Sequence, residues 1–243
     1  MKTHRMELGL LLAAVLGASA CSSAAGPDPW RGFNQPVFGF NDALDRHVLG
    51  PVARGWDWLL PGFVLTGVDN FFRNLDMPRT FFNDALQAKP THCAHDVWRF
   101  VINSSVGVAG FVDVATKLGL EENREDFGQT LGYWGVPAGP YFVMPVLPFR
   151  STVRDWLAYP IDAAFDPTLW VGQFVLPYLY GPGVIDVVNR RAINNDQIEE
   201  NRREAIDWYV FVRDAALQNR EAAVHDDKKP SQEKQEELYD VDE

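Results

Sequence analysis

The sequence of 243 residues predicts an all-α protein built from short amphipathic helices, without a β-sheet core. Two observations predict this class. Apolar residues recur every three or four positions along the body of the chain, whereas alternating runs long enough for strands are missing from the sequence. Pro or Gly interrupts the pattern every ten to fifteen residues, so the helices are expected to depend on packing for their stability.

The composition excludes several broad classes. With 47% hydrophobic and 13% aromatic residues, the chain has enough apolar material for a folded core and is not a disordered protein. Its formal net charge of −11 argues against binding to nucleic acid, which needs clustered Lys and Arg, and against electrostatic docking on anionic lipid. The eight Trp, sixteen Phe and seven Tyr are many for a soluble protein.

Residues 1–20 are typical of a secretory signal peptide, because Lys2 and Arg5 precede an apolar stretch that ends in four small residues. Cys21 follows at once. A small-residue run ending in Cys resembles the bacterial lipobox, although Ala18 stands where that motif usually has Leu. We therefore expect acyl chains, palmitate among them, on Cys21 as the mature N-terminus. The alternative is a plain signal peptide that leaves Cys21 as an ordinary thiol.

The mature chain divides into three parts. Residues 21–29 form the anchor and a spacer, residues 30–220 form the helical domain, and residues 221–243 form an acidic tail that we expect to be disordered. The mature chain carries a net charge of −12, and half of it belongs to the tail, which has nine acidic and three basic residues. With Cys21 acylated, only Cys93 remains, so no internal disulfide is expected and Cys93 is interpreted as a buried small residue.

Apolar residues at helical spacing mark the expected helices of the domain. Pro78 interrupts the pattern and is expected to separate two of them, and the charged stretch 189–220 is expected to form one helix on the aqueous side. The apolar positions are Leu44, Val48, Val52, Trp56 and Leu59, then Val68, Phe71, Phe72 and Leu75, then Phe81, Phe82, Ala85 and Leu86, then Val97, Phe100 and Val101, and then Phe111, Val114, Ala115 and Leu118.

Two segments without any charged side chain determine how we expect the protein to meet a membrane. Residues 127–149 and 167–185 are 23 and 19 residues long, which is close to the length of a membrane span. The first contains four Pro and four Gly and the second three of each, so neither can cross hydrocarbon as a straight helix. Core loops of a soluble protein are one interpretation. Because Trp and Tyr are concentrated here, and because they favour the headgroup level of a bilayer, we expect a protein that lies in one membrane leaflet. Candidate membrane-facing residues on the amphipathic helices are Phe71, Phe72, Phe81 and Phe82.

Catalytic motifs are missing from the sequence. There is no G-x-S-x-G and no H-E-x-x-H, so we predict no catalytic residues, no cofactor and no enzyme activity. His92 and His95 could share a helical face as metal ligands, but no second Cys/His pair lies elsewhere, so no metal site is predicted. Asp126, Asp155 and Asp162 could serve as acid/base pairs, although helix caps and salt bridges explain such residues more simply.

Four stretches of the chain resemble the MlaA (VacJ) lipoproteins of the Gram-negative outer membrane. Their order and spacing, together with the lipobox and the acidic end, extend the resemblance over most of the mature chain. The stretches are DPWRGFNQPVFGFNDALD (28–45), NFFRNLDMPRTFFNDALQ (70–87), RFVINSSVGVAGFVDVA (99–115) and DFGQTLGYWGVPAGPYFVMPVLPFRSTVRD (126–155).

The resemblance implies a ring-shaped, all-helical protein in the inner leaflet of the outer membrane, lipid-anchored and exposed to the periplasm. It implies that the protein associates with a trimeric porin, surrounds an amphipathic channel, and passes mislocalised phospholipid from the outer leaflet to a soluble periplasmic carrier. By analogy with bacterial lipoproteins, an Asp directly after the lipidated Cys would retain the protein at the inner membrane. Residue 22 is Ser, so the sequence agrees with sorting to the outer membrane. A structural lipoprotein that braces a porin and a lipid hydrolase remain as alternatives. Candidate channel or lipid-facing residues are Gly132, Tyr133, Trp134, Gly135, Gly139, Tyr141 and Phe142.

Overall fold

A computed structural model describes residues 28–146, 151–165 and 182–226. The predicted all-α class is confirmed, because the described residues contain helices and a single antiparallel bridge between Tyr141 and Thr152. The elements are α2 (Arg31–Leu44), a π-helical turn η1 (Asp45–Leu49), α3 (Gly50–Leu59), α4 (Gly62–Leu86), α5 (Pro90–Ser105), α6 (Val114–Lys117), α7 (Phe127–Tyr133), α8 (Val153–Ala164), α11 (Pro182–Ile193), α12 (Asn195–Glu204) and α13 (Trp208–Val224). The signal peptide, Cys21 and most of the second uncharged segment lie outside the described residues.

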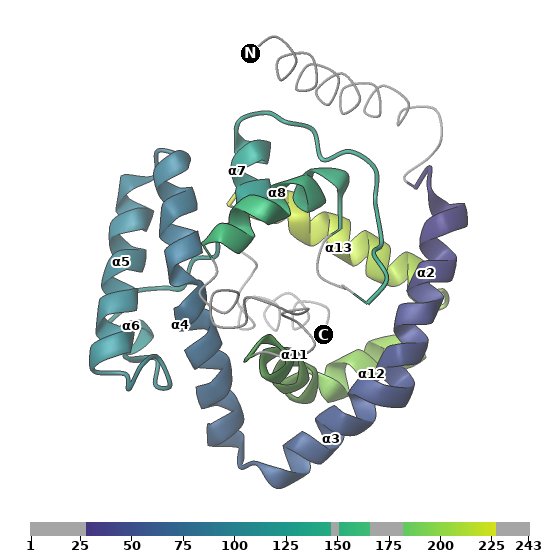
Figure 1. Ribbon diagram of the computed structural model, residues 1–243, viewed down its shortest axis with the longest axis horizontal. Coiled ribbons are helices and arrows are strands. Elements are labelled where there is room, and N and C mark those ends of the chain that lie inside the picture. The colour runs from purple at the N-terminus through teal and green to yellow at the C-terminus, as the bar shows by residue number, and fades with distance from the viewer. Residues whose placement is uncertain (1–27, 147–150, 166–181, 227–243) are drawn as a thin grey trace, which may run out of the picture.

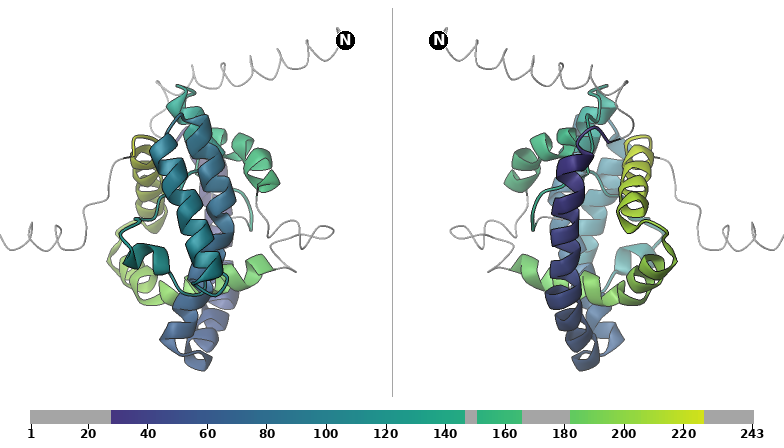
Figure 2. Two further views of the ribbon diagram at one scale, coloured as in Figure 1. Left: turned by 90° about the vertical axis from the view of Figure 1, so that its left-hand side faces the viewer. Right: turned by 90° about the vertical axis from the view of Figure 1, so that its right-hand side faces the viewer.

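The described helices are arranged in a ring (Figure 1). Helix α2 continues through η1 into α3, α3 contacts α11, α11 contacts α4, and α4 contacts α7. Helix α13 then closes the circuit by contacting both α7 and α2. Edge-on views show α4 and α5 side by side and the α3–α4 junction projecting beyond the rest of the ring (Figure 2). No helix in the described part of the chain has the length and apolar character needed to cross a membrane.

Helix α4 runs without a break through Pro78 for 25 residues, so the prediction that Pro78 separates two helices is wrong. Proline removes one backbone donor from the helix, and its cost is offset when the helix packs tightly on a neighbour. Helix α4 packs along α5 both before and after Pro78. The Asn74 Nδ2 donates to Ser104 Oγ at 2.8 Å, and the Phe81 and Phe100 rings lie 6.4 Å apart.

The carboxyl-terminal region also differs from its prediction. The stretch 189–220 is divided into α11, α12 and α13, with breaks at Asn194 and at residues 205–207. Asp207 has an extended backbone and its side chain accepts from Val210 N at 3.1 Å, so it caps a new helix instead of continuing the old one. Helix α13 then passes the expected boundary at residue 220 and ends at Val224. Lys89 binds Asp226 just beyond it, so the folded domain includes the first residues of the predicted tail.

Candidate functional site

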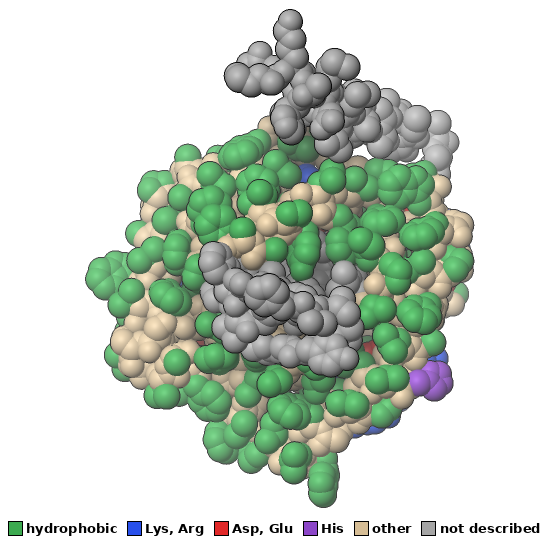
Figure 3. Space-filling model, viewed as in Figure 1, with side chains coloured by type: hydrophobic (Ala, Val, Ile, Leu, Met, Phe, Trp, Pro, Cys, Tyr) green, Lys and Arg blue, Asp and Glu red, His purple; other side chains and the backbone are tan. Residues whose placement is uncertain are grey.

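Large apolar side chains are exposed over much of the ring. Three of them cluster at the projecting α3–α4 junction, where Trp58 is 86% and Phe63 72% exposed, with Leu59 between them. Hydrophobic side chains dominate the face of the molecule seen in Figure 3, and charged side chains reach it at only a few points. Such a continuous apolar surface on a single chain indicates contact with lipid or with another protein.

The interior has the opposite character. The largest fully buried side chains among the described residues are all polar or charged: Gln87, Glu125, Asn34, Asn83, Asn189, Thr80, Thr130, Thr152, Asp84, Asp96, Asp155 and Asp162. Water-soluble domains bury mainly aliphatic and aromatic residues, so this distribution is inverted. Proteins in lipid gain nothing from hiding apolar groups, and they keep their polar groups inside, where these pair with one another.

Asn34 illustrates how the interior satisfies its polar groups. Its Nδ2 donates to Asp28 Oδ1 and to the Tyr141 carbonyl, both at 2.9 Å, and its Oδ1 accepts from Val143 N at 3.0 Å. The Tyr209 hydroxyl donates to the other oxygen of Asp28. Through this network the start of α2 holds the loop that follows α7 against α13.

The structure divides the predicted channel residues into two groups. Tyr133, Trp134 and Gly135 are exposed, and Gly135 has a φ of +88°, which favours glycine. Phe142 is half-buried beside Phe33, with the two rings stacked 5.7 Å apart. These positions are open to a ligand or a partner, although their predicted role in a channel stays a prediction.

The second group is packed inside the chain. Tyr141 is only 6% exposed and belongs to a hydrophobic cluster with Val143 and Tyr209, so the expectation that it faces a channel or lipid is corrected. A Cβ on Gly132 would lie 2.7 Å from Arg154 Nη1, and one on Gly139 would lie 3.3 Å from Val153. Gly132 therefore allows α7 to pack closely on α8, and Gly139 does the same for the loop that follows α7.

Of the four predicted membrane-facing phenylalanines, one is buried and three are half-buried. Phe72 is 6% exposed and packs edge-on against Phe71, with ring centroids 5.3 Å apart, so it does not face a membrane as expected. Phe71, Phe81 and Phe82 are half-buried. Phe82 stacks on Phe165, the residue that follows α8, with ring centroids 3.9 Å apart. The helix faces that carry these phenylalanines are apolar, as predicted, but part of each face packs against other residues of the protein.

The three aspartates act as helix caps and ion-pair partners. Asp126 accepts from Gln129 N at 2.9 Å at the start of α7, and Asp162 accepts from Phe127 N at 2.7 Å. Asp155 accepts from the Thr152 hydroxyl at 2.7 Å at the start of α8. Arg220 binds both Asp126 and Asp155. This arrangement fixes the amino-terminal ends of α7, with which the first uncharged segment begins, and of α8, which follows that segment.

The His92–His95 segment shows no metal-binding geometry. Both histidines are exposed on the first turns of α5, and the described residues include no group of three or more His, Cys, Asp or Glu that could hold a metal ion. Cys93 is half-buried, less than the full burial expected. Burial, followed by the nearby carboxyl groups of Asp84 and Asp96, raises the pKa of its thiol, which disfavours a reactive thiolate.

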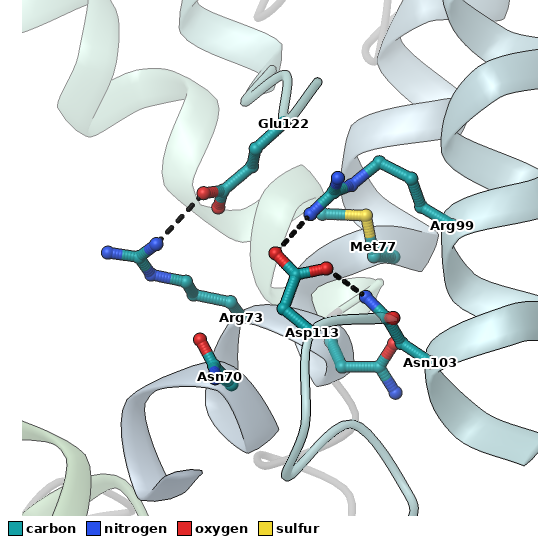
Figure 4. Close-up of a pocket in the computed structure, with 8 residues that line it drawn as sticks. Asn70, Arg73, Met77, Arg99, Asn103, Asp113 and Glu122 are labelled. Atoms are coloured by element: carbon teal, nitrogen blue, oxygen red, sulfur yellow. Dashed lines mark hydrogen bonds and ion pairs between the residues drawn. The ribbon is translucent and has the colours of Figure 1, made fainter. Parts of the chain in front are cut away.

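A small polar pocket lies between α4, α5 and the segment that follows α5 (Figure 4). Arg73 binds Glu122 at 2.9 Å and Arg99 binds Asp113 at 3.0 Å. Burial opposes the charge of Asp113, but hydrogen bonds from Thr116 and Asn103 and the nearby Arg99 lower its pKa to about 2. This pocket was not predicted from the sequence, because its residues come from three separate segments and no spacing links them.

A closed ring of helices that buries polar side chains and exposes large apolar ones defines a class of helical protein with inverted polarity. The chain belongs to the MlaA lipoprotein family, whose sequence model matches residues 26–223. The resemblance seen in the sequence is thereby confirmed.

Individual relatives agree with the family. An "Intermembrane phospholipid transport system lipoprotein MlaA" from Haemophilus influenzae is 32% identical over 238 residues, covering 92% of this chain and 93% of the relative. An uncharacterized protein from Rickettsia bellii is 36% identical over 201 residues, covering 81% of this chain and 76% of the relative. A solved structure described as "Structural basis for maintenance of bacterial outer membrane lipid asymmetry" has a TM-score of 0.69 at 31% identity, with 81% of this chain and 98% of that chain covered. These names describe a transport lipoprotein and no enzyme.

Proposed function

We propose that this chain is the outer-membrane lipoprotein of an intermembrane phospholipid transport system. In this proposal it removes mislocalised phospholipid from the outer leaflet and passes it to a periplasmic carrier, which maintains lipid asymmetry. Membership of the MlaA family and the name of the Haemophilus influenzae relative support the proposal.

The observation that carries the proposal is the inverted polarity of the ring. A phospholipid that leaves a bilayer needs polar groups near its headgroup, while its acyl chains stay in contact with apolar surface. The described residues place exposed apolar side chains such as Trp58 and Phe63 on the outside and polar side chains such as Asn189 and Gln87 inside. A protein of this kind lets a headgroup pass without opening the surrounding hydrocarbon to water.

The anchor and the partners complete the proposal. Acyl chains on Cys21 and the apolar surface hold the protein in the inner leaflet of the outer membrane, with its charged carboxyl-terminal part toward the periplasm. A trimeric porin is the proposed neighbour in the membrane, and a soluble phospholipid-binding protein is the proposed acceptor. Movement along the ring needs no nucleotide at this chain, so energy enters through the partners.

Deletion of the gene tests this function. We expect phospholipid to accumulate in the outer leaflet, measured by its accessibility to an external phospholipase, and a plasmid copy of the wild-type gene to reverse this. A structural lipoprotein that braces a porin predicts instead a change in porin recovery with normal surface lipid. Normal surface phospholipid in the deletion strain would therefore refute transport and favour the brace.

A further inference from the structure

Two carboxyl groups that form no ion pair with Lys or Arg among the described residues face each other between α4 and α5. Asp84 lies in the last turn of α4 and Asp96 in the second turn of α5, and both side chains are 0% exposed. They lie close enough to hydrogen-bond to each other when one of them carries a proton. Two carboxylates at this separation, out of contact with water, repel each other strongly.

The hydrogen bonds around the pair are incomplete. Asp84 Oδ1 accepts from Asn123 Nδ2 at 3.1 Å. Asp84 Oδ2 and both oxygens of Asp96 have no donor with good geometry among the described residues. A buried, ionised carboxylate without donors is very costly, so native proteins rarely keep one. Three such oxygens in one place need either a proton or a cation.

The charged and titratable neighbours do not neutralise the pair. From the α4–α5 turn, Lys89 is already bound to Glu125 at 3.2 Å and to Asp226 at 2.7 Å. From α5, Arg99 is bound to Asp113, and His92 and Cys93 also face the pair. From the segment before α7, Glu125 adds a further acid nearby. The nearest Lys and Arg side chains are thus committed to other carboxylates, and the charges of His92 and Lys89 oppose the rise in the pKa of Asp84 without cancelling it.

We propose that Asp84 and Asp96 share one proton in the folded protein, and that the resulting O–H···O hydrogen bond fastens α5 to α4. Asp84 holds the proton and donates it to the Asp96 carboxylate, which satisfies two of the three oxygens at once. When the proton is lost, two negative charges face each other in a buried space, and α5 is pushed away from the side of the ring. The proposal does not depend on the transport function.

The electrostatics agree with this geometry. Burial, followed by the hydrogen bond to Asp96 and the charge of Asp96, raises the pKa of Asp84 to about 8. Burial also raises the pKa of Asp96 to about 6, although Asp84, Arg99 and the side chain of Asn123 oppose the shift. A carboxyl group whose pKa is higher in the folded than in the unfolded chain stabilises the fold at low pH, and this stability is lost as the pH rises through the folded-state value.

The test is the melting temperature of the full lipoprotein in detergent between about pH 5 and about pH 8.5. We expect the wild-type melting temperature to fall by about 5 °C over this range. The Asp84→Asn variant keeps a donor for Asp96 and has no proton to lose. The fall in its melting temperature should therefore be less than half that of the wild type. At the upper pH it should melt above the wild type. Asp84→Ala, which removes the donor, should melt lower at every pH. Asp57→Asn is the matched control, because Asp57 is exposed on α3, and it should follow the wild type.

A second measurement keeps the proposal testable if a variant folds poorly. Hydrogen exchange of wild-type backbone amides, corrected for the intrinsic pH dependence, should show residues 90–105 losing protection at the higher pH while residues 31–44 keep theirs. Equal loss in both helices, or a wild-type pH dependence in Asp84→Asn, would overturn the shared proton. Millimolar Ca²⁺ or Mg²⁺ gives a further outcome. If either ion raised the melting temperature of the wild type but not that of Asp84→Asn, the site would hold a metal ion, and the shared proton would be overturned.

Discussion

Arg220 on α13 binds Asp126 with two hydrogen bonds of 2.6 Å each, and its Nε donates to Asp155 at 2.8 Å. Burial opposes the charge of this guanidinium, but the two carboxylates outweigh the cost and raise the pKa of Arg220. One side chain thereby joins α13 to the first turns of α7 and α8. The first uncharged segment begins at α7, so its position in the ring depends on this contact.

Replacing Arg220 with Ala should destabilise the ring strongly. The change leaves Asp126 and Asp155 as two largely buried carboxylates without their common cation. We expect a loss of about 2–4 kcal/mol, because removal of one partner from a buried ion pair strands the other. Chemical denaturation in detergent measures this loss. Arg203→Ala is the control, since Arg203 is exposed on α12, and it should cost less than about 0.5 kcal/mol.

Gly128 is the position where a single added methyl group should break the same contact. A Cβ there would lie 2.4 Å from Arg220 Nη2 and 2.7 Å from Asp155 Oδ1. Gly128→Ala should therefore destabilise the protein by about 2 kcal/mol, as overpacking does elsewhere. A Cβ on Gly39 in α2 would meet nothing within 4 Å, so Gly39→Ala should instead stabilise the helix by about 0.5–1 kcal/mol. The same direction of change in both variants would contradict this interpretation.

Asp113 should make stability depend on pH at the acid end. Its folded-state pKa of about 2 lies below the unfolded value, so the stability it contributes is present above about pH 4 and is lost as the pH falls toward the folded-state value. Asp113→Asn should cost about 1–2 kcal/mol at neutral pH, since Arg99 loses its charged partner. Denaturation at a series of pH values should show this difference shrinking below about pH 4. A difference that is constant with pH would show that the charge of Asp113 is unimportant.

The exposed aromatic side chains at the α3–α4 junction should bind lipid without help from the anchor. A Cys21→Ser protein, which carries no acyl chains, should still float with vesicles of phosphatidylethanolamine and phosphatidylglycerol. Trp58→Asp and Phe63→Asp should each reduce this partitioning about 10-fold or more, because a charge in hydrocarbon is costly. Ile206→Asp is the control, because Ile206 is also fully exposed but follows the charged helix α12. Equal loss in all three variants would refute a localised lipid-binding surface.

The sequence predicted the helices well where local spacing determines them. The run from Leu44 to Leu59 became the end of α2, η1 and α3, and Asp126 became the expected cap of α7. It failed at Pro78, because the packing of α4 on α5 outweighs the local preference for a break. Local patterns report propensity, and tertiary contacts can override it.

The site was harder to predict because its contacts join distant segments. Tyr141 is buried because it packs near Tyr209, which lies 68 positions later in the chain, with ring centroids 6.3 Å apart. Phe72 is an apolar aromatic residue of the kind that faces lipid, but its side chain is buried within the protein. Composition identified the unusual segments, whereas only the three-dimensional arrangement shows that polar groups are inside and apolar groups outside.

The central claim is that phospholipid passes along this chain. Photo-crosslinking in cells tests it most directly, with a photoreactive amino acid at Tyr133 or Trp134, which are exposed at the carboxyl-terminal end of α7, and at Ile206 as the control. We predict phospholipid adducts, identified by mass spectrometry, at Tyr133 and Trp134 and none at Ile206. Absence of phospholipid adducts at both test positions, or equal adduct yields at all three, would contradict the account.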